Sequence, residues 1–407
     1  MKVHAPRDRR TTRIVVAAGS TSLLAPIGAS FLLVALPDLQ HGLSITKVAA
    51  GTTVTAYLIL MVIAQPLGGR LGDRFGRVRV LRAGMLLLVG ASTFGAVASD
   101  FQLVLVARLT QALAGSLAFP NAFAVIRNAV PAARRGRILG ALGAAVVVSS
   151  AAAIPLGQLI VHLGGWRATF LATAALAVPA LLLQTWREHD VAPDMSGRDV
   201  WLGTAGNRWR GRSGDFVAAI VSLGATNAAM YAFLVAVALG MAGEQRSSLF
   251  LFLFLGSSAV GAPLGGRVAD QVGRGPSAAS GLMAMLLGFA MVARPAATPE
   301  WILSMGTLLA GLGVGASMTA LQTVAADVSN ATRSGRAAGW LASARYLGAA
   351  AGSLAGSAFA IQEVGGENAA VVGALIGVLV ACTAAAGLVW KGPRRVFATM
   401  PEDAIEA

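Results

Sequence analysis

A nine-residue segment occurs twice in this chain, each time between two long apolar stretches. The first copy spans Gly69 to Arg77 and reads Gly-Arg-Leu-Gly-Asp-Arg-Phe-Gly-Arg, and the second spans Gly266 to Arg274. Both copies follow Pro-Leu-Gly, and a second pair of basic segments, 134–137 and 333–336, recurs at nearly the same offset. Two anchors repeated at nearly constant spacing indicate an internal duplication.

The composition places most of the chain in lipid. Hydrophobic residues make up 56% of the 407 residues and charged residues only 12%, which is too apolar for a soluble fold. A bilayer core of about 30 Å needs about 20 apolar residues per helix. Windows of that length predict an all-α membrane protein with twelve transmembrane helices. The predicted spans are 14–37, 48–68, 80–98, 101–125, 138–163, 166–184, 215–240, 247–265, 277–293, 301–325, 338–361 and 369–390.

The spans divide into two six-helix bundles. Residues 1–184 form the predicted N-terminal bundle and residues 215–391 the C-terminal bundle. Residues 185–214 are rich in Gly, Arg and Trp and are expected to be a cytoplasmic linker, and residues 392–407 a cytoplasmic tail.

Basic residues are distributed unequally between the two membrane faces. Most of the 32 Lys and Arg residues lie in the tails, the linker and the loops of one face. The other face holds Lys47, Arg167, Arg246 and Arg294, and two arginines, Arg108 and Arg345, fall within spans. This bias predicts that both termini are cytoplasmic. It also accounts for the net charge of +14 without a nucleic-acid partner, which would need a continuous basic patch outside the membrane.

The sequence gives no sign of a metal site, a cofactor or an enzyme centre. Cys382 is the single cysteine and lies in the last span, and the four histidines are not clustered with acids. No nucleophile or acid pair is placed to act as a catalyst. We therefore expect a protein that is not an enzyme and that needs no metal or cofactor.

The repeated segment has the chemistry of a conformational switch. Gly69, Gly72 and Gly76 allow a sharp turn and close backbone approach, and Asp73 is the only acid among several arginines. Its carboxylate is expected to pair with arginine or with the N-terminal end of a neighbouring helix. The expected switch residues are Gly69, Asp73, Gly76 and Arg77, and in the second copy Gly266, Asp270, Gly273 and Arg274.

Both copies resemble the signature loop G-x-L-x-D-x-x-G-R of the major facilitator superfamily of secondary transporters. The second copy departs from it at Val268 and Ala269. The resemblance covers nearly the whole chain. It implies two six-helix bundles that rock about a central substrate site, so that the site opens to each side of the membrane in turn.

Further segments resemble the drug:proton antiporters of that superfamily. Arg108 and Gln111 look like the Arg-x-x-Gln motif of helix four, and Pro155 and Gly157 are similar to the antiporter motif of helix five. Residues 165–170 resemble the Gly-Trp-Arg-x-x-Phe entry to helix six. The resemblance implies multidrug efflux, with Arg108 and Gln111 as the charge and its partner in the cavity.

Three features depart from the antiporter pattern. Ile154 stands where Gly normally precedes the proline of helix five, and Gln158 stands where a second Gly is usual. Residues 26–30 of helix one carry no acid, unlike the fourteen-helix branch. With only twelve spans, the chain resembles a twelve-helix relative.

The acids of the chain lie at span ends, and none falls at the expected membrane midplane. Proton coupling normally needs a group whose proton affinity changes as the cavity changes access. Asp38, Asp73 and Asp327 are the available candidates, and Asp38 is the one assigned to coupling together with Arg108. Arg108 would cost about 2.5–3.5 kcal/mol to insert, so it is expected to face the cavity with partners, the alternative being a structural tie between helices.

Polar residues concentrate in the first, fourth, seventh and tenth spans. In the fold that the resemblance implies, these spans line the central cavity. Residues expected there are Ser30, Asn121, Asn227, Tyr231 and Gln322.

The combined interpretation is a monomeric transporter of the cell inner membrane. It exports small, partly lipophilic compounds, of drug or antibiotic type, by alternating access in exchange for protons. The alternative is a uniporter or symporter for a specific metabolite or organic anion, with Arg108 in substrate recognition. A transporter-derived sensor would carry a signalling domain, and the tail is too short for one.

A reporter enzyme that is active only outside the cell tests the topology. Fused after Ala407, it should stay inactive because the charge bias places the C-terminus in the cytoplasm. The same reporter in the loop at Arg294 should be active. Activity at Ala407 would reverse the orientation.

Overall fold

A computed structural model describes residues 5–130, 132–184, 213–240, 244–292, 299–328 and 334–359. All regular elements in these ranges are α-helices. They are α1 (Ala5–Gly42), α2 (Lys47–Phe75), α3 (Arg77–Ala96), α4 (Phe101–Ala129), α5 (Ala132–Leu182), α6 (Ser213–Gly240), α7 (Glu244–Val272), α8 (Arg274–Val292), α9 (Glu300–Val328) and α10 (Ser334–Phe359). Nearly all of the predicted linker, the twelfth span 369–390 and the tail 392–407 lie outside the described residues.

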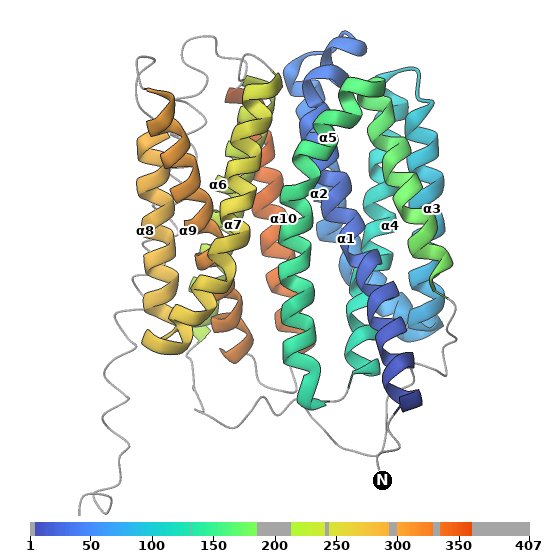
Figure 1. Cartoon of the computed structure of the whole chain (residues 1–407), viewed down its shortest axis with the longest axis vertical. Coiled ribbons are helices and arrows are strands. Elements are labelled where there is room, and N and C mark those ends of the chain that lie inside the picture. The colour runs from blue at the N-terminus through green and yellow to red at the C-terminus, as the bar shows by residue number, and fades with distance from the viewer. Residues whose placement is uncertain are drawn as a thin grey trace, which may run out of the picture.

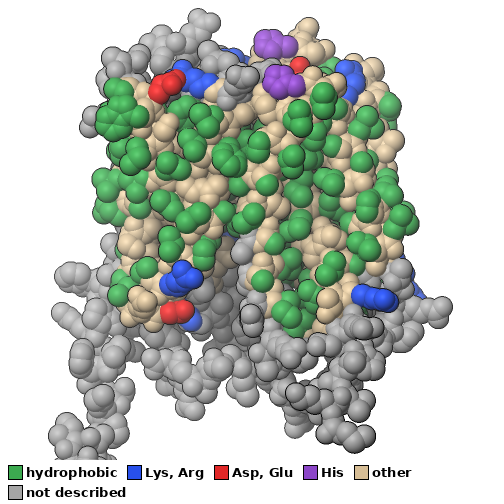
Figure 2. Space-filling view, in the orientation of Figure 1, with side chains coloured by type: hydrophobic (Ala, Val, Ile, Leu, Met, Phe, Trp, Pro, Cys, Tyr) green, Lys and Arg blue, Asp and Glu red, His purple; other side chains and the backbone are tan. Residues whose placement is uncertain are grey.

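The helices have the length and surface of membrane spans. Within the described residues, nine of them are long and apolar enough to cross a bilayer. In Figure 2 apolar side chains cover the middle of the molecule, and charged side chains gather near its two ends. The side chains of Ile63 and Leu86, for example, are each 61% exposed at the outer surface of the molecule. Such side chains are stable only against lipid, so the molecule is a multi-pass helical membrane protein.

The helix α5 contains two of the predicted spans. Gly164 (φ −155°, ψ 19°) and Gly165 (φ 67°, ψ −171°) break its helical geometry. Figure 1 shows the chain rising through the centre of the molecule and returning beside α3 after this break. The spans predicted at 138–163 and 166–184 are therefore two antiparallel arms. A turn of two glycines joins them directly.

The helices pack as two groups that meet along two seams. Helices α1 to α5 pack among themselves, as do α6 to α10, and between the groups α2 contacts α10 and α5 contacts α7. Thr55 Oγ1 donates to Ser353 Oγ at 3.0 Å across the α2–α10 seam. Ser248 Oγ donates to Gln158 Oε1 across the α5–α7 seam.

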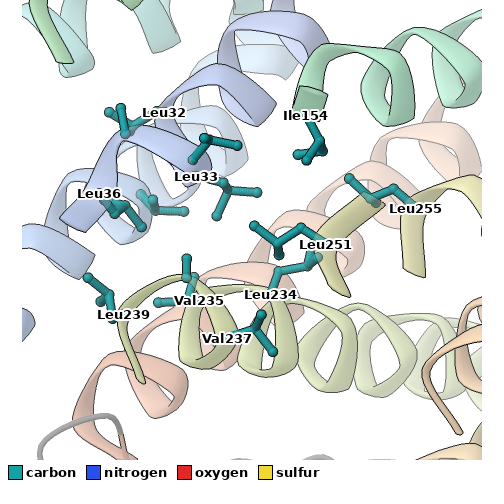
Figure 3. Close-up of a cluster of buried hydrophobic side chains, with 14 of the residues drawn as sticks. Leu32, Leu33, Leu36, Ile154, Leu234, Val235, Val237, Leu239, Leu251 and Leu255 are labelled. Atoms are coloured by element: carbon teal, nitrogen blue, oxygen red, sulfur yellow. The ribbon is translucent and has the colours of Figure 1, made fainter. Parts of the chain in front are cut away.

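An apolar cluster joins the two groups near the ends of α1 and α6. We call it the interbundle cluster; Figure 3 labels its members Leu32, Leu33, Leu36, Ile154, Leu234, Val235, Val237, Leu239, Leu251 and Leu255. All ten side chains are buried. Because they come from α1, α5, α6 and α7, burying them holds both helix groups together at this face of the molecule.

Glycines let helices approach closely at matching positions of the two halves. A methyl group added at Gly68 of α2 would overlap the backbone oxygen of Ser116 in α4, and one added at Gly265 of α7 would overlap the backbone of Ala316 in α9. A methyl group at Gly69 would meet no atom within 4 Å. The close contact between helices that was expected at Gly69 therefore occurs at Gly68.

Gly68→Ala and Gly69→Ala form a matched pair that tests this packing. Overpacking at Gly68 should cost about 1–3 kcal/mol and lower the unfolding midpoint of the purified protein by several degrees. Gly69→Ala should leave the midpoint unchanged or raise it, since Ala is the better helix former. Equal effects of the two substitutions would contradict the α2–α4 contact.

Candidate functional site: a buried arginine in a helix-lined pocket

The repeated segment forms the same turn twice. Gly76 ends α2 with φ 97°, and Gly273 ends α7 with φ 98°. Both angles lie in the left-handed region that favours glycine. The Gly76 N–H donates to Gly72 O at 3.0 Å, which closes the last turn of α2. The next helix of each half begins immediately after the turn.

Asp73 pairs with Arg77 across the first turn. Arg77 Nη2 donates to Asp73 Oδ1 at 2.5 Å, and the Asp73 side chain is 63% exposed. Asp270, at the matching position of the second half, is exposed. An exposed ion pair contributes little to stability, so the Asp73–Arg77 contact is weak enough to form and break during a conformational change.

Asn121 supports this loop from α4. Its Nδ2 donates to Gly68 O at 3.0 Å and to Leu117 O at 2.8 Å. Its side chain is fully buried beside Gly72. The residue therefore holds the end of α2 against α4 and does not belong to the pocket lining described next.

A pocket lies between the helices of the first half. It is lined by Thr21, Leu24, Ala25, Gly28, Ala29, Tyr57, Met85, Leu88, Arg108, Gln111, Gly115, Ala118, Phe119 and Thr173. These residues come from α1, α2, α3, α4 and the second arm of α5. The lining is mainly apolar with a few polar groups, and its volume of about 20 Å³ leaves room for about one water molecule in this conformation.

Arg108 is the charged group of this pocket. It is 4% exposed, and its Nη1 donates to Gln111 Oε1 at 2.7 Å. Gln111 Nε2 in turn donates to Ser92 Oγ at 2.8 Å. The guanidinium carbon lies 4.4 Å from the centroid of the Tyr57 ring, a cation–π contact. Nε of Arg108 has no hydrogen-bond partner within the described part of the chain.

The three tyrosines of the chain gather where the two halves meet. Tyr57 of α2, Tyr231 of α6 and Tyr346 of α10 are close enough to interact electrostatically. Gln65 Nε2 donates to the Tyr346 hydroxyl at 3.1 Å, linking α2 to α10. Sequence reasoning assigned only Tyr231 to the cavity. The convergence comes from three spans far apart in sequence, which no local pattern reveals.

Arg345 is a second arginine within a span, half-buried in α10 directly before Tyr346. Its Nε has no hydrogen-bond partner among the described residues. Sequence reasoning noted Arg345 as a charge inside a span but gave it no role. Its position inside an apolar span was the sequence signal that could have drawn attention to it.

Ser30, Asn227 and Gln322, also expected in the cavity, are not among the residues that line the pocket beside Arg108. Ser30 is buried in α1 but is not part of the pocket lining. Asn227 Nδ2 donates to Leu223 O at 2.8 Å within its own helix. Gln322 is half-buried towards the end of α9. None of the three contributes to the pocket beside Arg108.

Asp38 has a structural contact. Its Oδ2 accepts from the Trp166 N–H at 2.6 Å, at the start of the second arm of α5. The carboxylate caps a helix N-terminus there. Arg167 stacks at 4.2 Å from the Trp166 ring centroid and donates to Ala98 O at 3.0 Å. Asp38 is therefore engaged outside the pocket lining, and the Asp327 side chain is outside the described part of the structure.

The helix-five segment lies on the seam between the two halves. Ile154 is fully buried in the interbundle cluster, and Gln158 accepts from Ser248 of α7. At Gly157 an added methyl group would approach Phe31 of α1 to 3.1 Å. Pro155 faces outward. The two departures from the antiporter pattern, Ile154 and Gln158, are thus the residues that fill the α5–α7 contact.

Two groups of membrane-spanning helices, the first of which encloses a largely apolar pocket with a buried arginine, are the arrangement expected of a polytopic membrane transport protein. The sequence model of the Major Facilitator Superfamily matches residues 18–210 and 214–399. The chain therefore belongs to this superfamily, which confirms the resemblance drawn from the repeated loop. It is a transporter and not an enzyme.

Several named proteins are distantly similar. The chain is 28% identical to a chloramphenicol resistance protein of Streptomyces lividans over 335 residues, 80% of this chain and 83% of that protein. It is 28% identical to the multidrug resistance protein MdtL of Escherichia fergusonii over 182 residues, 45% of this chain and 46% of that protein. It is also 28% identical to the uncharacterized transporter YvkA of Bacillus subtilis over 40% of this chain, a match that spans only 37% of that relative.

Solved structures share the fold. A D-xylose-proton symporter superposes with a TM-score of 0.76 at 17% identity, covering 93% of this chain and 97% of the symporter. A bacterial homologue of the human lysosomal transporter Spinster superposes with a TM-score of 0.73 at 17% identity, covering 95% and 98% of the two chains. At such low identity the likeness concerns the fold alone.

Asp73→Asn should reduce transport at least tenfold while leaving substrate binding intact. The substitution keeps the shape of the side chain but removes the charge that attracts Arg77. Asp270→Asn, in the less complete copy, should have a smaller effect. Transport and equilibrium binding measured on the same purified protein separate the two steps. If Asp73→Asn transports at the wild-type rate, the loop is only a turn between two helices and has no role in the conformational change.

Proposed function

We propose that the chain exports small, partly lipophilic compounds from the cytoplasm in exchange for protons. It would act as a monomer in the cell inner membrane with both termini in the cytoplasm. The observation that carries the proposal is a buried arginine, Arg108, among mainly apolar pocket-lining residues inside a superfamily fold. The chloramphenicol resistance protein, similar along most of both chains, supports the export of antibiotic-like molecules.

Alternating access fits the way the two helix groups are joined. The interbundle cluster holds them together at the face where α1 and α6 end. With the proposed orientation this face is the outer one, so the pocket is closed to the outside in this conformation. Opening to the outside would require the cluster and the Thr55–Ser353 contact to separate, while the loops at Gly76 and Gly273 would come together on the inner face.

Proton coupling would be unusual in this pocket. Its lining contains no carboxylate, and Asp38 is engaged with Trp166. Coupling would then depend on competition between proton and substrate around Arg108, whose hydrogen bond to Gln111 would rearrange. A pocket lining without a carboxylate is also compatible with a second function, the transport of an organic anion or a specific metabolite without proton exchange. The unpartnered Nε of Arg108 favours that alternative.

Everted membrane vesicles test both functions. A panel of fluorescent dyes and antibiotics should accumulate in vesicles that contain the chain, and collapsing the pH gradient should stop the uptake. Vesicles with Arg108→Ala should insert the protein normally but transport nothing, because the pocket loses its charged group. Uptake that continues without a pH gradient would support the uniporter.

A further inference from the structure

We propose that Gln184 couples the Arg108 pocket to the repeated loop at Asp73 and Arg77. Gln184 lies two residues beyond the end of α5 at Leu182. This inference rests on the proposed function, because it specifies how the state of the pocket reaches the loop that controls alternating access. Gln184 is a positioning residue in this mechanism, since it is not part of the pocket lining.

Gln184 is buried where its neighbours in sequence are exposed. The residue is 4% exposed, whereas Leu182 and Leu183 are 71% and 52% exposed. A glutamine near a helix end can reach water easily, so its burial beside exposed leucines needs specific hydrogen-bond partners. The structure supplies such partners from two other helices.

Three hydrogen bonds hold Gln184 between α1, α3 and α5. Its Nε2 donates to Thr21 Oγ1 of α1 at 2.9 Å, and its backbone oxygen accepts from Arg82 Nη2 of α3 at 2.5 Å. Its backbone N–H donates to Leu181 O at 3.0 Å, which ties it to the last turn of α5. One residue thus joins three helices of the first bundle.

Thr21 is the pocket end of this junction. It is one of the residues that line the pocket beside Arg108. Its Oγ1 donates to Ala17 O at 3.1 Å within α1, so the hydroxyl uses its proton there and accepts from Gln184 with a lone pair. A molecule that displaces the Thr21 side chain would break its hydrogen bond to Gln184.

Arg82 is the loop end of the junction. It follows Arg77 by five residues in the same helix, about 7 Å along the axis. Arg77 in turn pairs with Asp73 at 2.5 Å across the turn that precedes α3. A helix moves as a rigid element, so a shift at Gln184 that displaces Arg82 also displaces the Asp73–Arg77 loop.

The contact with Thr21 stabilises the present conformation. Gln184 Oε1 has no hydrogen-bond partner among the described residues, so Thr21 is the one side-chain partner of this amide there. Losing it would leave the whole amide buried and unpaired, which is costly. Removal of the Thr21 hydroxyl should therefore favour the opposite conformation, in which the loops of the two bundles come together.

Two spin labels test this coupling. On a Cys382→Ser background, Arg74→Cys and Gln271→Cys place labels at exposed, matching positions of the two copies of the repeated segment. Their distance distribution in the detergent-purified full chain measures how far apart the two loops lie. Thr21→Val removes the acceptor for Gln184 and keeps the side-chain shape, so it should shift the distribution towards shorter distances. Thr21→Ser, which keeps the hydroxyl, should leave it unchanged.

A second substitution shows whether the effect passes through Gln184. In Gln184→Met, which keeps an unbranched side chain but has no amide, Thr21→Val should produce no further shift. Thr93→Val is the matched control, because the exposed Thr93 hydroxyl donates to Val89 O of its own helix at 3.0 Å. An unchanged distribution in Thr21→Val would overturn the proposal. An equal shift by Thr21→Val with and without the Gln184 amide would also overturn it.

The vesicle assay separates this coupling from the proposed function. If vesicles export none of the dyes and antibiotics but Thr21→Val shifts the label distances only when Gln184 is present, the coupling stands and active export is wrong. If vesicles export them and Thr21→Val changes neither the distances nor the rate, export stands and Gln184 only fixes the end of α5. Where export is observed, Thr21→Val should slow it about fivefold or more.

Discussion

A bilayer offers no hydrogen bonds to the chain, and the rest of the structure follows from that constraint. Each backbone N–H and C=O must be satisfied within the protein, so the described spans are helices throughout. Polar side chains obey the same rule. Thr53 Oγ1 donates to Ala50 O at 2.6 Å and Thr226 Oγ1 to Ser222 O at 2.7 Å, within their own helices. The few polar groups left without a partner are consequently informative about ligands.

This rule explains why the polar residues of a span are not all binding-site residues. Asn121 and Asn227 are polar and buried, yet their amides are used by backbone carbonyls. Asn121 Oδ1 and Arg108 Nε both lack a hydrogen-bond partner among the described residues, but of the two residues only Arg108 is charged and lines the pocket. The distinction depends on where carbonyls of neighbouring turns and helices lie, which residue types alone do not reveal.

Much of the fold could be predicted because it is encoded in local patterns. The repeated segment predicted two halves, and its glycines predicted a turn that the structure forms at Gly76 and Gly273. Apolar length predicted the two arms of α5 and the two-residue junction between them, which the structure places at Gly164 and Gly165. The contact of Tyr346 with Gln65 across the α2–α10 seam was missed because it depends on how separate helices pack.

The interbundle cluster has a thermal consequence. Separating the two helix groups at that face would bring leucine, isoleucine and valine side chains into contact with water. Hydration of apolar surface carries a large positive heat capacity and is resisted less strongly in the cold. The balance between the closed and open forms would therefore shift towards opening on cooling. The same contact that seals the pocket would thus make the resting conformation depend on the temperature at which the cell grows.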